Sequence, residues 1–136
     1  MSGLSIIEFG KHPTHWGLIK NPSHSYSEKN ISCGEFFHIS LNIENNTFTE
    51  IGFTGEGRLV AIASMSILAQ EFEGEDINTV FEHDIDSLLE LLEVEALTMK
   101  RMKSAALALL TFQNAILQWQ KKPLKKLSDI YDQYNS

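Results

Sequence analysis

The change of hydrophobic period after Gly57 is the feature of this sequence that most constrains its fold. Between residues 37 and 43, apolar side chains occupy every second position, and a similar segment returns between residues 48 and 54. This alternation is typical of strands with one buried face. Residues 44–47, Glu-Asn-Asn-Thr, have the composition of a turn, so the two segments predict a hairpin. Residues 24–29 are expected to form a third, weaker strand.

Beyond Gly57 the sequence is patterned for helices. A segment without proline runs from Val60 to Phe72 and stops before Gly74, which predicts a buried helix with a glycine just after its end. Asp76 is expected to cap a short helix that reaches about Glu82. Three further helices are predicted: one capped by Asp86 or Ser87 and ending near Glu93, one from Thr98 to Gln120, and one that begins with Pro123 as its first residue.

The longest predicted helix carries apolar residues at spacings of three and four, which places them on one core-facing stripe. The stripe consists of Met102, Ala105, Leu109, Phe112, Ile116 and Trp119. Strands followed by helices indicate an α+β fold, with a small antiparallel three-stranded sheet and helices packed on one face. The length of 136 residues fits one domain. We expect an arm and loop over residues 1–23, the sheet over 24–55 and the helices over 58–135.

Net charge, hydrophobicity and cysteine content limit the kinds of partner that this chain can bind. The formal net charge of −7 argues against binding nucleic acid through its phosphates. No apolar stretch approaches the ~20 residues that span a bilayer, and the first ten residues do not have the pattern of a signal peptide. The single cysteine cannot form an internal disulfide. We therefore expect a cytoplasmic protein without nucleic-acid or membrane partners.

Three short segments carry a resemblance to a known family. They are Asn30-Ile31-Ser32-Cys33-Gly34-Glu35, Gly55-Glu56-Gly57-Arg58 and Arg101-Met102-Lys103-Ser104-Ala105. In this order and at these separations they resemble the NifU/IscU/SufU family of iron–sulfur cluster scaffolds, and His12, Pro13 and Gly17 fit the pattern of that family upstream. The resemblance covers roughly residues 11–120. It implies the fold of the IscU and NifU N-terminal domains and a role in iron–sulfur cluster assembly.

The resemblance also implies a ligand site, with a cysteine in each segment and an acidic residue after the first. Here Cys33 and Glu35 keep candidate metal-ligand positions, whereas Arg58 and Ser104 replace the other two cysteines. A serine hydroxyl is a hard, protonated donor, and a guanidinium cannot bind a cation. We predict an Arg58–Glu35 salt bridge in a metal-free site. Lys103, beside the third position, is predicted to favour the thiolate of Cys33.

The sequence leaves three functions open, and we do not expect the chain to be an enzyme. The chain is a scaffold that holds an iron–sulfur cluster, iron or zinc, with Cys33 and Glu35 pooled across a homodimer. Alternatively, it holds no cofactor and regulates or connects a cysteine desulfurase or other assembly proteins. As a third possibility, Cys33 accepts and transfers sulfur, or is an ordinary free thiol. A chaperone partner is not expected, because residues 97–100 read Leu-Thr-Met-Lys where the family has its chaperone motif.

Overall fold

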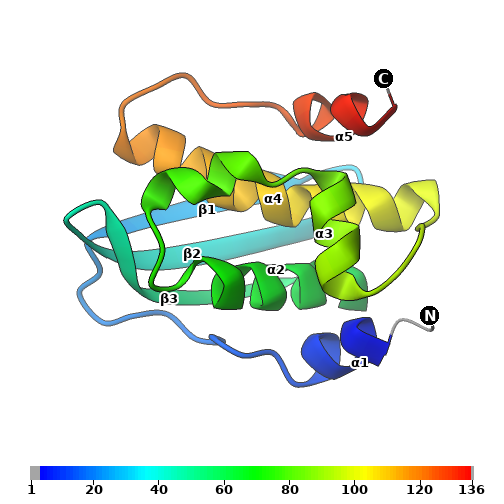
Figure 1. Ribbon diagram of the computed structural model, residues 1–136, viewed down its shortest axis with the longest axis horizontal. Helices are drawn as coiled ribbons and strands as arrows, with labels where there is room; N and C mark the ends of the chain where they lie inside the picture. Colours follow the sequence, from blue (N-terminus) through cyan, green and yellow to red (C-terminus); the bar gives the residue numbers. More distant parts are fainter. Residues whose placement is uncertain (1–3, 136) are drawn as a thin grey trace.

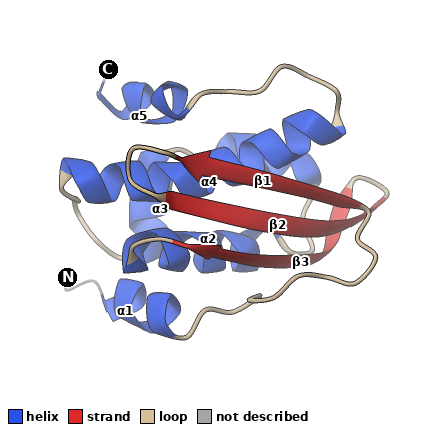
Figure 2. Cartoon of the chain, turned by 180° about the vertical axis from the view of Figure 1, so that it is seen from behind, coloured by secondary structure: helices blue, strands red, loops and turns tan. Residues whose placement is uncertain are grey.

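The computed structural model describes the backbone of residues 4–135 and the side chains of residues 4–132. Its elements are α1 (Leu4–Lys11), β1 (His24–Asn30), β2 (Glu35–Glu44), β3 (Thr47–Glu56), α2 (Leu59–Phe72), the 3-10 helix η1 (Ile77–Glu82), α3 (Ile85–Leu92), α4 (Met99–Trp119) and α5 (Leu127–Asn135). The strands form one antiparallel sheet in the order β1-β2-β3. Helices α2 and α4 cover one face of it, so that Figure 2 shows the strands in front of both. The predicted α+β fold is confirmed.

The β2–β3 hairpin forms where the sequence predicts it. Glu44 pairs with Thr47, and the two residues between them, Asn45 and Asn46, have φ angles of 52° and 59°. Two successive left-handed residues are the requirement of a type I′ turn, which matches the natural twist of a hairpin, and asparagine accepts this conformation more readily than most residues. The turn fixes the pairing of Ile43 with Phe48, and a register shift between Asn42 and Ile43 sets the pairing of the rest of the hairpin.

The segment between α1 and β1 lies along the outer edge of β3. The N–H of Gly17 donates to the carbonyl of Phe53 at 2.7 Å, and the N–H of Phe53 donates to the carbonyl of His15 at 3.0 Å. Further along, the N–H of Ile19 donates to Oγ of Ser40 at 2.8 Å. The two bonds with Phe53 satisfy part of the free edge of β3. The bond from Ile19 brings the segment over the central strand, where Ser40 is buried although it points away from the helices.

Replacing Gly52 by alanine is expected to lower the free energy of unfolding by about 2–4 kcal/mol. A Cβ atom at this position would lie 2.3 Å from the carbonyl oxygen of Gly17, so the main chain of the covering segment would have to move. Urea denaturation measures the effect. Glu50→Ala, an exposed change on the same strand, is the control and is expected to stay within about 0.5 kcal/mol. Equal stability of the two variants would contradict this packing.

The helix starts agree with the sequence in part. Asp76 accepts from the N–H of Asn78 and caps η1, as predicted. The predicted helix from Thr98 to Gln120 is α4, and Thr98 is its cap. The prediction for α3 was wrong: its cap is Asp84, whose carboxylate accepts from the N–H of Ser87 while Oγ of Ser87 accepts from the N–H of Asp84. This reciprocal pair satisfies two N–H groups at once, which favours it over a cap at Asp86 or Ser87.

The prediction that Pro123 begins the last helix was also wrong. α5 begins only at Leu127, after an irregular connection that runs beside α4. The side chain of Asn114, in α4, binds both the N–H and the carbonyl of Lys125, at 2.8 and 3.0 Å. Those two main-chain groups are therefore engaged by α4 and do not form helical hydrogen bonds.

Helix α4 is the centre of the molecule, and the predicted single stripe was too narrow. Every residue from 104 to 116 is buried, whereas Trp119 at the end of the stripe is exposed. The reason is that α4 contacts α2, α3, α5, η1 and the strands β1 and β2 (Figure 1). A helix surrounded on all sides has no polar face to show in its sequence. Within residues 4–135, no helix has the length and apolar character needed to cross a membrane.

Candidate functional site

Three segments that are distant in the sequence meet at one end of the sheet. Glu35 is the first residue of β2, Arg58 immediately precedes α2, and Ser104 lies in the second turn of α4. The resemblance predicts that these three positions share one site, and hydrogen bonds join all of them. We call Glu35, the hydroxyl of Ser104 and the main-chain N–H of Arg58 the Glu35 cluster.

The carboxylate of Glu35 accepts hydrogen bonds at both of its oxygens. Oγ of Ser104 lies 2.8 Å from Oε1 and 2.9 Å from Oε2, and the N–H of Arg58 donates to Oε2 at 2.9 Å. Glu35 is only 3% exposed and Ser104 is fully buried. A buried carboxylate needs such donors because it has lost its water. The cluster therefore ties the start of β2 to the N-terminus of α2 and to the second turn of α4.

Gly57 allows the main chain to come this close to the carboxylate. A Cβ atom at Gly57 would lie 3.0 Å from Oε2 of Glu35 and 3.3 Å from Cβ of Ala61. Such contacts are tighter than ordinary van der Waals packing, so a larger residue would push Glu35 away from the N–H of Arg58. The glycine that the sequence shares with the scaffold family has a packing role here.

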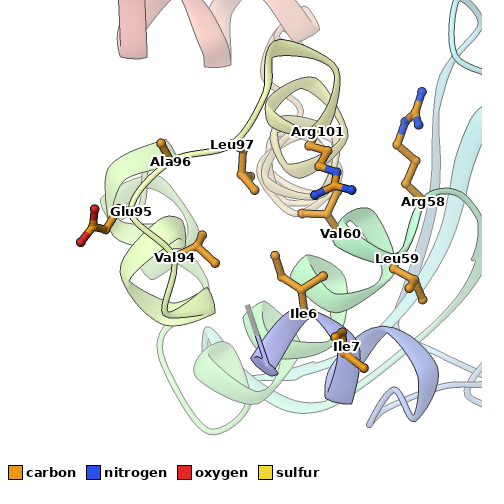
Figure 3. Close-up of a pocket in the computed structure, with 10 residues that line it drawn as sticks. All are labelled: Ile6, Ile7, Arg58, Leu59, Val60, Val94, Glu95, Ala96, Leu97 and Arg101. Atoms are coloured by element: carbon orange, nitrogen blue, oxygen red, sulfur yellow. The ribbon is translucent and has the colours of Figure 1, made fainter. Parts of the chain in front are cut away.

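The predicted Arg58–Glu35 salt bridge does not form. Within the described residues, Glu35 has no ion-pair partner, and Arg58 contacts it only through the main-chain N–H. Arg58 occupies the position before α2 with an extended backbone (φ −63°, ψ 157°), which turns the N–H inward. Its side chain is exposed, and Figure 3 shows it extending away from the helices. A guanidinium placed outside remains hydrated, whereas burial would remove its water.

Cys33 and Lys103 stand apart from the cluster in their contacts. Cys33 is exposed on the turn over residues 31–34, where its N–H donates to the carbonyl of Asn30 at 3.2 Å. The ammonium of Lys103 lies 5.3 Å from the ring centre of Tyr131 on α5, a cation–π contact. The predicted action of Lys103 on Cys33 has no contact that supports it in the described part of the chain.

The residues present do not fit a zinc ion or an iron–sulfur cluster held by one chain. Both need about four ligands, and cysteine thiolates above all for the cluster. Here both oxygens of Glu35 accept hydrogen bonds from protein donors, and the hydroxyl of Ser104 donates to that carboxylate. The guanidinium of Arg58 cannot bind a cation. Among the residues that the structure describes, no group of three or more histidine, cysteine or acidic side chains is arranged to hold a metal ion.

Sequence reasoning identified the cluster's positions but not its hydrogen bonds. A signal was present: a serine stands at one ligand position and a carboxylate is kept at another. A hydroxyl donor and a carboxylate acceptor are complementary, whereas neither alone is a strong ligand for a soft metal. The predicted partner of Glu35 was Arg58, because a charge is easier to recognise in a sequence than a buried hydroxyl.

Comparison with known proteins agrees with the resemblance. The model of the NifU-like N-terminal domain matches residues 4–126. The zinc-dependent sulfurtransferase SufU of Bacillus subtilis is 25% identical over 103 residues, which cover 68% of this chain and 69% of SufU. The iron–sulfur cluster assembly scaffold protein IscU of Thermotoga maritima is 25% identical over 81 residues, or 60% of this chain and 57% of IscU.

Two solved structures have the same fold. A NifU-like protein (N-terminal) from Brucella abortus superposes with a TM-score of 0.71 at 16% identity, over 88% of this chain and 94% of the other. FiSufU, of the SUF system of Fervidobacterium islandicum AW-1, gives a TM-score of 0.69 at 18% identity, over 83% of this chain and 94% of the other. At these identities the likeness concerns the arrangement of strands and helices.

Proposed function

Because the chain belongs to the family of NifU-like N-terminal domains, we propose that it acts in iron–sulfur cluster assembly as a scaffold-like protein whose own cluster site is closed. The similarity to relatives named SufU and IscU supports the assignment of this chain to that process. In this proposal the chain works through protein contacts, with a cysteine desulfurase or another assembly component as partner, and in the cytoplasm. It performs no catalysis of its own.

The observation that carries this proposal is the Glu35 cluster. Soft metal centres are held by deprotonated donors whose lone pairs are free. In this chain the retained carboxylate is buried and accepts hydrogen bonds from two donors, and the hydroxyl at the third ligand position is one of them. A metal would have to break these bonds without gaining a second thiolate from the same chain. The fold is therefore held together at this end by hydrogen bonds in place of metal–ligand bonds.

Sulfur transfer by Cys33 has weaker support. The relative from Bacillus subtilis is named a sulfurtransferase, and Cys33 is exposed on a turn as a sulfur acceptor must be. A reactive cysteine also needs a neighbouring cation or base. Lys103, the predicted cation, contacts Tyr131, and the Arg58 side chain extends into solvent. The adaptor function needs neither group and is favoured for that reason.

The first test measures iron and acid-labile sulfide in anaerobically purified protein, before and after reconstitution with iron and sulfide. We expect both to stay well below stoichiometric amounts, and Cys33→Ser to leave them unchanged, because the ligand positions are occupied by a hydrogen-bonded cluster. Stoichiometric iron and sulfide that are lost in Cys33→Ser would contradict the closed site. That result would favour a homodimer that pools Cys33 and Glu35 from two chains.

The adaptor function is tested separately, with the metal-free chain and a purified cysteine desulfurase from the same organism. We expect a complex in size-exclusion chromatography and calorimetry that is insensitive to a metal chelator and unchanged in Cys33→Ser. The absence of a complex, together with no effect on desulfurase turnover, would remove this partner from the proposal.

A further inference from the structure

A cavity of about 630 Å³ lies beside the Glu35 cluster and shares Arg58 with it. Its walls come from α1, the start of α2, the connection over residues 94–97 and the first turn of α4 (Figure 3). The volume falls within the ~300–1,000 Å³ that is usual for small-molecule sites. Ile7 and Leu59 in its wall are exposed, so the cavity is open to solvent.

Seven of the ten residues that line the cavity are apolar. They are Ile6, Ile7, Leu59, Val60, Val94, Ala96 and Leu97. Ile6 and Val94 face each other across the cavity in Figure 3. Ile7 and Leu59 are 48% and 41% exposed, although side chains of this size are usually buried in the core. Covering them with an apolar group would remove hydrocarbon from water, which is favourable.

The three charged side chains of the wall point in different directions. Figure 3 shows the guanidinium of Arg101 directed toward the interior, that of Arg58 at the rim and extending outward, and the carboxylate of Glu95 pointing away. Neither arginine has an ion-pair partner within 4.0 Å among the described residues. The interior of the cavity therefore presents one guanidinium above an apolar floor, with no carboxylate to neutralise it.

We propose that this cavity binds a small organic monocarboxylate, in which a carboxylate is carried on an apolar body. A guanidinium is planar and binds a carboxylate through two parallel hydrogen bonds. One inward guanidinium matches one negative charge, whereas a phosphate monoester brings close to two. The apolar body covers the hydrocarbon wall between α1 and α2. This ligand uses none of the hydrogen bonds of the Glu35 cluster, so the inference stands independently of the proposed function.

The test titrates the isotope-labelled full chain with octanoate and follows its amide signals by NMR. We expect saturable shifts at residues 6–7, 58–60 and 94–101. Octanol lacks the charge and should bind roughly tenfold more weakly, the size expected for one charge-assisted contact. Acetate keeps the charge but lacks the apolar body, so it should also bind more weakly because it buries little hydrocarbon. Octyl phosphate is the fourth probe and is expected to bind no more tightly than octanoate.

Arg101→Gln is expected to weaken octanoate binding by about tenfold or more. Lys100→Gln is the matched control, since it removes an equal charge from the same helical turn outside the cavity wall and should bind as the wild type does. Both side chains are exposed, so both variants should keep the wild-type spectrum elsewhere. Absent saturation, equal binding of octanol, unchanged affinity in Arg101→Gln or tighter binding of octyl phosphate would each overturn the proposal.

Discussion

Replacing Ser104 by alanine is expected to lower the free energy of unfolding by about 2–4 kcal/mol. The serine hydroxyl is the only side-chain donor that Glu35 has among the described residues, and both groups are buried. Its loss leaves a charged carboxylate with the N–H of Arg58 alone. The better helix propensity of alanine returns only about 0.5 kcal/mol, so the loss dominates. Chemical denaturation at neutral pH measures the difference.

Ser64→Ala is the matched control for this result. Ser64 is as buried as Ser104 and also lies in a helix, but its hydroxyl donates only to the carbonyl of Val60 in its own helix, at 2.6 Å. We expect it to cost less than about 1 kcal/mol. A double-mutant cycle of Ser104→Ala with Glu35→Gln should give a coupling energy of about 1–3 kcal/mol. No coupling between the two positions would contradict the hydrogen-bonded cluster, whatever the single variants do.

Asn114→Ala is expected to destabilise the chain by about 3 kcal/mol and to loosen α5. The Asn114 side chain is 1% exposed and donates to Glu28 at 2.8 Å, in addition to its two bonds with the main chain of Lys125. Burial, with the neighbouring Glu28 carboxylate, raises the pKa of Tyr26, so its hydroxyl stays protonated and also donates to Glu28. Without Asn114, Tyr26 remains as the one side-chain donor to Glu28 among the described residues, and the connection before α5 loses its bonds to α4.

Denaturation gives the stability of Asn114→Ala, and limited proteolysis between residues 120 and 127 reports the release of α5. Gln120→Ala is the control amide at the end of the same helix. Its single bond, to Asn78 at 2.9 Å, lies at the surface, and its loss should cost no more than about 1 kcal/mol. Wild-type resistance to proteolysis in Asn114→Ala would show that other contacts hold α5 in place.

The local features of the fold could be predicted because each depends on neighbouring residues. The alternation of apolar and polar residues over 37–43 indicates a strand with one buried face, and the two asparagines indicate a turn with a left-handed backbone. The caps Asp76 and Thr98 act on N–H groups only two or three residues away. The start of the last helix was wrongly predicted because a distant segment competed. Pro123 permits a helix, but Asn114 in the neighbouring helix holds the chain in another conformation.

The candidate site shows the same division. Residue identity and spacing are enough to show which residues occupy the ligand positions of the scaffold family, and therefore that the cysteine set is incomplete. What the remaining groups do depends on how the chain packs. It buries Glu35 between α2 and α4, brings Ser104 to it across 69 residues of sequence and leaves Cys33 exposed. Burial turns a possible ligand into a hydrogen-bond acceptor, since a carboxylate without water takes the nearest donors that the fold supplies.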